Sequence, residues 1–345
     1  WGISVTKEEA RTSDAYDYAA GFVGLNRMRI DGTDFVESFI QMQKAVHFVR
    51  EERKPLLVCA KTVLIGHHTS GVRREFYRDE ADLAKHRAKD PGIILKKYLL
   101  EEGFSEETLS QIEIEARKQI EEDFNKAILA PDPKPETVKE HVYAPTPITE
   151  EKGTRIPENG EKIPMVDAGI HAIQELMHKH PEALLYGQDV GGRIGGVFRE
   201  AVTLQQKFGN KRVFNTAIQE AYIIGSTVGM SAVGLKPIVE VQFADYIYPG
   251  INQLVTEVSK SCYLSNGKYP ISNIIRVPIG AYGGGGPYHS GSVETMLAQI
   301  KGIKIAYPSN AADFKGLFKA AFYDPNPVIF LEHKGLYWSK VPGTE

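Results

Sequence analysis

The sequence predicts an α/β protein in which a doubly wound parallel sheet, with helices on both faces, follows a partial second α/β domain. Two observations support this fold class. After residue 163, apolar and β-branched runs alternate with helical patterns, and near-continuous apolar strands separated by helices are typical of buried parallel sheets. Before residue 131, only two convincing strands accompany the helices, which are too few for an independent domain of this class.

The segment between these regions, residues 131–163, is rich in Pro, Glu, Lys and Thr and shows no helical or strand periodicity. Such a composition cannot bury a core, so we expect an extended linker. The chain is therefore predicted to comprise part of a first domain (1–130), this linker (131–163) and a second domain (164–345).

In the first region a strand at 28–30 leads through the turn Asp31-Gly32 into a helix at 34–50, and an apolar strand follows at 56–61. A charged loop comes next. A helix is then expected at 105–128, because its apolar residues recur at helical spacing behind Ser105, which suits an N-cap.

In the second region, six apolar runs predict strands at 183–186, 212–216, 237–243, 273–278, 303–307 and 328–331. Helical patterns lie between them at 166–178, 221–233, 251–263 and 311–322. Because crossover connections between parallel strands are right-handed, we expect these elements to form a doubly wound sheet.

The bulk composition argues against several classes of partner. Of 345 residues, 42% are hydrophobic and the formal net charge is −3, so nothing calls for nucleic acid or an anionic membrane. No apolar run approaches the roughly 20 residues needed to span a bilayer, and no secretory signal pattern occurs. The cysteines Cys59 and Cys262 lie in apolar segments, so we expect no disulfide framework and a cytoplasmic location.

The segment 215–222 is the first candidate site, because it lies where a predicted strand gives way to a helix. Ligands of open α/β sheets bind beyond the carboxyl ends of the strands, so Glu220 is well placed for a functional residue. An alternative stays open, since the helix dipole alone also favours a glutamate in a first turn.

A glycine run at 283–286, followed by His289, is the second candidate. Glycines permit close contact with a ligand, and a histidine in such a loop can move protons near neutral pH. The run lacks the Gly-x-Gly-x-x-Gly spacing, which argues against a nicotinamide-binding protein. A flexible surface loop is the alternative.

The third candidate is the loop that begins with His67-His68 and ends with Tyr77 and Arg78. Zinc is disfavoured here, because no third ligand stands at metal spacing. The cationic side chains could instead hold a phosphate or an anionic substrate. The alternative is a solvated, charged loop.

The order of these segments is more specific than any one of them. The runs 218–220 (Ile-Gln-Glu), 240–249 (Glu-Val-Gln-Phe-Ala-Asp-Tyr-Ile-Tyr-Pro), 288–292 (Tyr-His-Ser-Gly-Ser) and 327–332 (Pro-Val-Ile-Phe-Leu-Glu) follow one another in the second region. In these motifs, residues 164–337 resemble the beta chain of 2-oxoacid dehydrogenases.

The first region carries the runs 29–34 (Arg-Ile-Asp-Gly-Thr-Asp), 65–68 (Ile-Gly-His-His) and 76–78 (Phe-Tyr-Arg), and it resembles the second half of the matching alpha chain. The chain therefore looks like an alpha/beta fusion. It is most similar to the branched-chain (2-oxoisovalerate) type, with the pyruvate type as the alternative. Leu64 departs from the arginine that is usual in the family, which puts details of the histidine loop in question.

The resemblance implies a thiamine-diphosphate-dependent decarboxylase that passes an acyl group from a 2-oxo acid to the lipoyl domain of an acyltransferase component. Glu220 matches the glutamate that hydrogen-bonds the aminopyrimidine ring, Tyr246 matches an aromatic residue lying against that ring, and Ile218 is expected to contact the cofactor. His289 and His68 match the two histidines near the thiazolium, where each can donate or accept a proton.

Tyr77 and Arg78 match the end of the loop that organises the cofactor end of the site. Asp324 and Asn326 fall where the family holds a structural potassium ion. The magnesium–diphosphate motif would lie upstream of the first residue, and the domain that docks the acyltransferase core would lie beyond the last. We therefore expect few Mg²⁺ ligands in this chain. The resemblance also implies a homodimer, because members of the family are dimers of alpha–beta pairs. Whether the chain turns over or only folds and dimerises without tight cofactor binding stays open.

Overall fold

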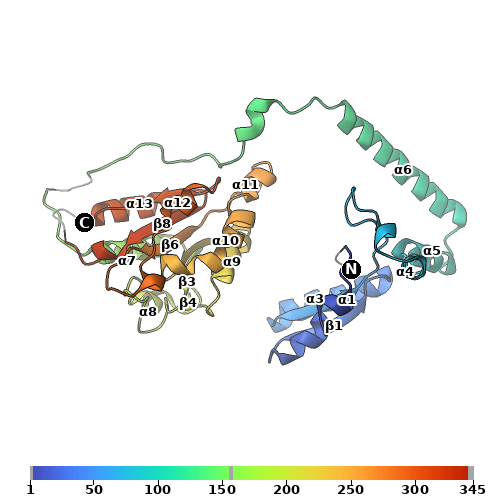
Figure 1. Ribbon diagram of the computed structural model, residues 1–345, viewed down its shortest axis with the longest axis horizontal. Coiled ribbons are helices and arrows are strands. Elements are labelled where there is room, and N and C mark those ends of the chain that lie inside the picture. The colour runs from blue at the N-terminus through green and yellow to red at the C-terminus, as the bar shows by residue number, and fades with distance from the viewer. Residues whose placement is uncertain (1–2, 155–157, 341–345) are drawn as a thin grey trace. The chain divides into compact units, whose positions relative to one another are not determined.

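The computed structural model describes residues 3–154 and 158–340. It divides into two compact units, Trp1–Asp132 and Pro133–Glu345, which we describe separately (Figure 1). The division falls inside the segment that the sequence predicts as a linker. Of the helices in the described residues, none is long and apolar enough to cross a membrane.

Unit 1 contains a parallel strand pair with helices around it. Its helices and strands are α1 (Lys7–Ala10), α2 (Ala15–Tyr18), β1 (Asn26–Asp31), α3 (Phe35–Glu52), β2 (Leu56–Lys61), α4 (Glu80–Arg87), α5 (Pro91–Glu101) and α6 (Glu106–Leu129). The two strands pair in parallel from Asn26 opposite Leu56 to Asp31 opposite Lys61. The prediction of two strands joined by a helix is thus confirmed.

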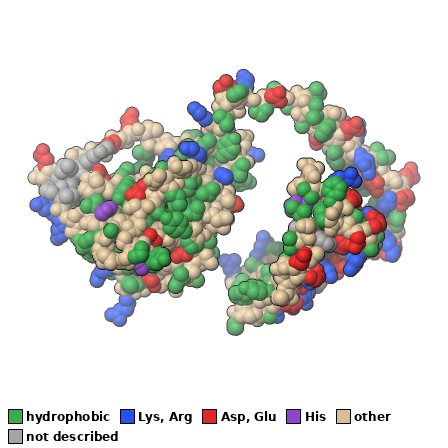
Figure 2. All heavy atoms as spheres, viewed as in Figure 1, with side chains coloured by type: hydrophobic (Ala, Val, Ile, Leu, Met, Phe, Trp, Pro, Cys, Tyr) green, Lys and Arg blue, Asp and Glu red, His purple; other side chains and the backbone are tan. Residues whose placement is uncertain are grey.

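Helix α6 also begins as predicted, because the Ser105 hydroxyl accepts a hydrogen bond from the Thr108 amide at 3.1 Å. Its apolar stripe, however, is mostly exposed. Leu109 is buried, whereas Ile120 and Phe124 are more than 60% exposed. Figure 2 accordingly shows hydrophobic and charged side chains together along α6.

Unit 2 is a six-stranded parallel sheet with helices on both faces, as predicted (Figure 1). The strands are β3 (Ala183–Gly187), β4 (Val213–Asn215), β5 (Lys236–Glu240), β6 (Ile274–Ile279), β7 (Lys304–Ala306) and β8 (Val328–His333). Their order across the sheet is β4-β3-β5-β6-β8-β7. The helices are α7 (Met165–Lys179), α8 (Leu204–Phe208), α9 (Glu220–Ala232), α10 (Tyr248–Gln253), α11 (Ser261–Leu264), α12 (Glu294–Ala298) and α13 (Ala311–Tyr323).

Successive side chains of the strands point to opposite faces of the sheet, and each face has its own hydrophobic core. Leu185 and Phe330 belong to the core with α7, α8 and α13, whereas Tyr186 and Leu331 belong to the core with α9, α10 and α12. This explains why the strands read as continuous apolar runs, since both faces of each strand are buried.

Helices α7 and α13 pack closely because Gly169 has no side chain. A Cβ atom at Gly169 would lie 2.7 Å from the Cε1 atom of Phe314, closer than any real packing contact. The glycine therefore allows the Phe314 ring to enter the interface between the two helices.

The prediction of one continuous helix at 251–263 is wrong. Helix α10 passes into a π-helical segment (Leu254–Val258), and α11 starts only at Ser261. The Ser259 amide donates to the carbonyl of Leu254, five residues back, while the Ser259 hydroxyl bonds the Val255 carbonyl. These bonds widen the helical ladder and interrupt it.

Part of the predicted linker lies against unit 2. The Ala144 amide donates to Asn326 Oδ1 at 2.7 Å, the Asn326 amide group returns a bond to the Ala144 carbonyl at 2.9 Å, and Tyr143 donates to the Ile303 carbonyl. The segment around Ala144 is therefore held beside unit 2, because the Asn326 side chain satisfies both backbone groups of Ala144 and Tyr143 bonds the residue before β7.

Candidate functional site

The candidate residues of unit 2 follow one edge of the sheet. Strands β3, β4, β5 and β6 are parallel, so their carboxyl ends lie at the same edge. The segments that leave this edge carry Gln188 after β3, Glu220 after β4, Tyr246 after β5 and His289 after β6. A ligand site in an open α/β sheet is expected at this edge.

Glu220 is the first residue of α9 and is only 9% exposed. Its Oε1 atom accepts a hydrogen bond from Gln188 Nε2 at 3.0 Å, whereas its Oε2 atom has no donor among the described residues. Gln188 is itself held through its carbonyl by Gln242, whose amide also donates to Asp189. Burial and orientation by a glutamine exceed what a purely dipolar role requires, which favours the functional interpretation of Glu220.

Tyr246 and His289 form a hydrogen-bonded pair. His289 Nδ1 lies 2.8 Å from the carbonyl of Gly285, and its Nε2 lies 2.7 Å from the Tyr246 hydroxyl. A carbonyl only accepts, so in the neutral imidazole Nδ1 carries the hydrogen and Nε2 accepts from Tyr246. The edge of the Phe243 ring lies against His289, with the centroids 4.7 Å apart. The pair can therefore hold or move a proton at Nε2.

Ile218 lies in the turn between β4 and α9 and is 85% exposed. This large apolar side chain is therefore available to a flat ligand at the same edge as Glu220. Tyr222 in the first turn of α9 is also exposed.

The predicted cofactor residues His68, Tyr77 and Arg78 belong to unit 1. His68 is exposed, and the neighbouring His67 accepts the Arg74 amide at its Nδ1 atom. Arg78 is buried. Its guanidinium donates to Asp82 at 2.6 Å and to the Leu64 carbonyl at 2.8 Å. Arg78 thus stabilises the histidine loop by linking Leu64 to Asp82. Tyr77, the preceding residue, is partly buried.

The residues expected to bind potassium do not fit that ion. Asp324 accepts the Lys304 ammonium at 2.6 Å on one oxygen and the Asn326 amide groups on the other. Asn326 Oδ1 is taken by the Ala144 amide. The ammonium of Lys304 already supplies the positive charge that a potassium ion would bring.

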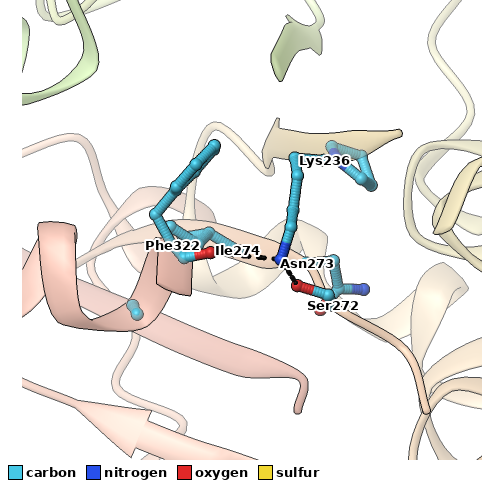
Figure 3. A pocket seen from close by; sticks show the side chains of 7 residues that line it. Lys236, Ser272, Asn273, Ile274 and Phe322 are labelled. Carbon is cyan, nitrogen blue, oxygen red and sulfur yellow. Dashed lines mark hydrogen bonds between the residues drawn. The ribbon is translucent and has the colours of Figure 1, made fainter. Parts of the chain in front are cut away.

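A second ammonium, that of Lys236, bonds Ser272 and the Phe322 carbonyl close by (Figure 3). Across the described residues, no group of three or more His, Cys, Asp or Glu side chains is placed to hold a metal ion.

A buried ionic cluster lies at the ends of the strands that carry the site. Arg276 donates two bonds to Glu332, at 2.7 and 2.9 Å, and one to Glu240 at 3.2 Å. Tyr337 donates to Glu332 at 2.8 Å. Burial and repulsion from Glu200 raise the pKa of Glu240 well above its usual value.

Glu200 and Glu240 each keep one buried oxygen that no described donor faces. The two carboxyls interact with each other, so a proton shared between them would satisfy both oxygens. Neither this cluster nor Gln188 was predicted from the sequence. The signal for the cluster was present, since Arg276 stands inside an apolar strand, where a charge must be paired.

A doubly wound parallel sheet with a buried glutamate and a tyrosine–histidine pair at its carboxyl edge defines a ligand-binding α/β protein. Comparison with known proteins gives the family. Residues 161–339 match the family described as transketolase, pyrimidine binding domain, and residues 1–136 match the family described as dehydrogenase E1 component. The first match covers more than half of the chain, so the chain belongs to the transketolase pyrimidine-binding domain family.

The chain is also similar to beta subunits of 2-oxoacid dehydrogenases. It is 41% identical over 195 residues to the 2-oxoisovalerate dehydrogenase subunit beta of Pseudomonas aeruginosa (52% of this chain, 55% of that protein). It is 42% identical over 172 residues to the same subunit of Bacillus subtilis (50% and 52%). It is 41% identical over 175 residues to the pyruvate dehydrogenase E1 component subunit beta of Acholeplasma laidlawii (51% and 53%).

The chain spans about half the length of these relatives. The resemblance to the 2-oxoacid dehydrogenase family is confirmed. The branched-chain and pyruvate types are matched equally well, so these comparisons do not distinguish them.

Proposed function

We propose that this chain forms the cofactor-activating part of a thiamine-diphosphate-dependent 2-oxoacid dehydrogenase, with a branched-chain 2-oxo acid as substrate. The observation that carries the proposal is Glu220, which is buried, is oriented by Gln188 through Oε1 and has no described donor at Oε2. Pyruvate is the second candidate substrate, because relatives of both types match equally well.

Thiamine diphosphate, when bound, supplies a thiazolium carbon that accepts the 2-oxo acid and stabilises the negative charge left by carbon dioxide. The residues present fit its aminopyrimidine ring. Glu220 Oε2 would meet a ring nitrogen, with Gln188 fixing the carboxylate orientation. Tyr246 and Ile218 would offer an aromatic and an apolar surface to the ring.

His289 would hold or move a proton at Nε2, once that nitrogen exchanges the Tyr246 hydroxyl for a reacting group. His68 is the second proposed proton carrier. Tyr77 would lie at the diphosphate end, and Arg78 would act there by shaping the loop, because its guanidinium bonds Asp82 and Leu64. Mg²⁺ would accompany the diphosphate.

The proposed acyl acceptor is the lipoyl domain of an acyltransferase component, and the proposed assembly is a homodimer. Exposed apolar side chains beside the site, namely Ile218 and Tyr222, would be covered in such an assembly. Sedimentation of the chain at micromolar concentration tests the dimer, and a monomer alone would contradict it.

The catalytic proposal is tested by reduction of an artificial electron acceptor with 2-oxoisovalerate, thiamine diphosphate and Mg²⁺. We expect turnover by the wild-type chain and none by Glu220→Ala. Asp167→Ala is the matched control, because it removes an acidic residue from the first turn of another helix, α7, which packs on the opposite face of the sheet from α9. Wild-type turnover no higher than that of Glu220→Ala would refute the proposal.

A second candidate function is a binding or structural role. On this view the chain folds and dimerises but does not bind the cofactor tightly. Calorimetric titration with thiamine diphosphate and Mg²⁺ separates the two. Micromolar binding that Glu220→Gln weakens supports the catalytic proposal, whereas no binding supports the second candidate.

A further inference from the structure

Lys334 is a buried lysine behind the candidate site. It starts the short helix η7 (Lys334–Leu336), immediately after β8, and is 1% exposed. Its ammonium donates to the main-chain carbonyl of His289 and lies 4.7 Å from the centroid of the Phe243 ring and 5.8 Å from that of Phe198. Burying an ammonium is costly, so it is kept buried only by specific partners, here a carbonyl and two aromatic faces.

The loop that carries His289 does not fix the position of this residue by itself. Gly283, Gly284 and Gly286 have φ angles of 88°, 63° and 74°, and residues 281–288 are exposed. Glycine-rich backbone in this region adopts many conformations at little cost. Within the loop, His289 bonds the carbonyls of Gly285 and Gly286, which belong to the same glycine run. Contacts from outside the loop therefore set where the run and His289 lie together.

Those contacts come from two elements. Tyr246 holds the imidazole through Nε2, and Lys334 holds the main chain of the same residue. Asp245 adds a bond to the Gly291 amide at 2.9 Å, which closes the end of the loop. Lys334 is the one cation among these anchors, and a carbonyl accepts more strongly from a charged donor than from a neutral one.

Lys334 is also rigidly mounted. Two residues before it, Glu332 accepts hydrogen bonds from Nε and Nη2 of Arg276 and from the Tyr337 hydroxyl. These bonds tie the end of β8 and the start of η7 to β6. Burial lowers the pKa of Lys334, and the Asp245 carboxylate opposes that effect.

We infer that Lys334 is a positioning residue, whose buried ammonium holds the His289 main chain so that the imidazole stays aligned on Tyr246. This inference rests on the proposed function only for the role of His289 in turnover. The geometry of the anchor itself can be tested without cofactor or substrate.

The test is nitrogen-15 NMR of the histidine rings in the full chain, with the His289 signal assigned by His289→Gln. In the wild type we expect one tautomer, with hydrogen on Nδ1. Lys334→Met keeps the length and apolar stem of the side chain but removes the charge, and we expect an averaged signal from both tautomers. Lys334→Arg should restore most of the wild-type signal.

Lys236→Met is the matched control. Lys236 is a partly buried lysine of the same sheet whose ammonium also donates to a main-chain carbonyl, that of Phe322, but it starts β5 at the opposite, amino edge (Figure 3). We expect Lys236→Met to leave the His289 signal unchanged. An unchanged signal in Lys334→Met, or an equal change in Lys236→Met, would overturn the inference.

If Lys334→Met does not fold, Lys334→Gln, which is shorter and neutral but still polar, gives the same reading, and an unchanged signal again overturns the inference. Where the chain turns over, Lys334→Met should lower kcat about tenfold or more with little change in KM, because proton transfer is affected rather than binding. If Glu220→Ala shows that the proposed function is wrong, the tautomer result still stands or falls on its own.

Discussion

Replacing Arg276 with methionine tests the buried ionic cluster most directly. Methionine fills similar space but leaves Glu332 and Glu240 without their cation, and all three side chains are at most 1% exposed. Breaking a buried pair by removing one partner costs about 3–5 kcal/mol. For a unit of this size, each kcal/mol shifts Tm by about 2–4 °C, so we expect a loss on the order of 10 °C.

Differential scanning calorimetry at neutral pH measures this loss, with the transition of unit 2 followed separately from that of unit 1. Lys319→Met is the control, because the Lys319–Glu175 pair is 36% and 40% exposed and such pairs contribute less than about 1 kcal/mol. Adding Glu332→Gln to Arg276→Met should recover part of the loss, since it removes an uncompensated charge. If Arg276→Met is as stable as Lys319→Met, the reasoning is refuted.

Three further predictions concern packing, ions and pH. Lys304→Met should lower the stability of unit 2 by about 1–2 kcal/mol, because it removes a partly exposed ammonium from Asp324. Because Lys304 already occupies that carboxylate, the wild-type Tm should be equal in KCl and NaCl, and a clearly higher Tm in KCl would contradict this expectation. Gly169→Ala should cost about 1–3 kcal/mol by driving a methyl group into Phe314, whereas Gly316→Ala, which meets no atom within 4 Å, should be neutral or stabilising in thermal melts. The raised pKa of Glu240 means that the folded state keeps a proton that the unfolded state releases above pH 4.5, so stability falls as pH rises from there toward the folded pKa. Glu240→Gln should flatten that decline above pH 4.5 in melts over a pH series, and an unchanged slope would argue against the shared proton.

The strands and most helices could be predicted because their signals are local. Strand 56–61 and the N-cap at Ser105 agree with the structure, since an apolar run and a hydroxyl before a helix each act over a few residues. The break after Val258 could not be predicted, because it depends on side-chain bonds that compete with a regular helix.

Only some residues of the candidate site could be predicted from the sequence. Glu220, Tyr246 and His289 were proposed from the order of motifs, but Gln188 and Lys334 were not, because a single polar residue after a strand carries no pattern of its own. Their roles arise from the sheet order, which brings the ends of β3, β4, β6 and β8 to one edge. Asp324 and Asn326 were assigned to potassium because sequence motifs do not reveal a lysine that reaches them from another strand.

The ionic cluster and the site are expected to respond together, because they share the same strand ends. Glu240 is the last residue of β5 and pairs with Arg276 of β6, while Glu332 stands two residues before Lys334. The segments beyond these strand ends carry Tyr246 and His289. Loss of the Arg276 bonds to Glu332 should therefore increase the mobility of Lys334. Its hydrogen bond to the His289 carbonyl should weaken as a result. We expect Arg276→Met to broaden the His289 nitrogen signal at temperatures well below its own Tm. If the variant loses stability while that signal stays sharp, the cluster stabilises the sheet without positioning the site.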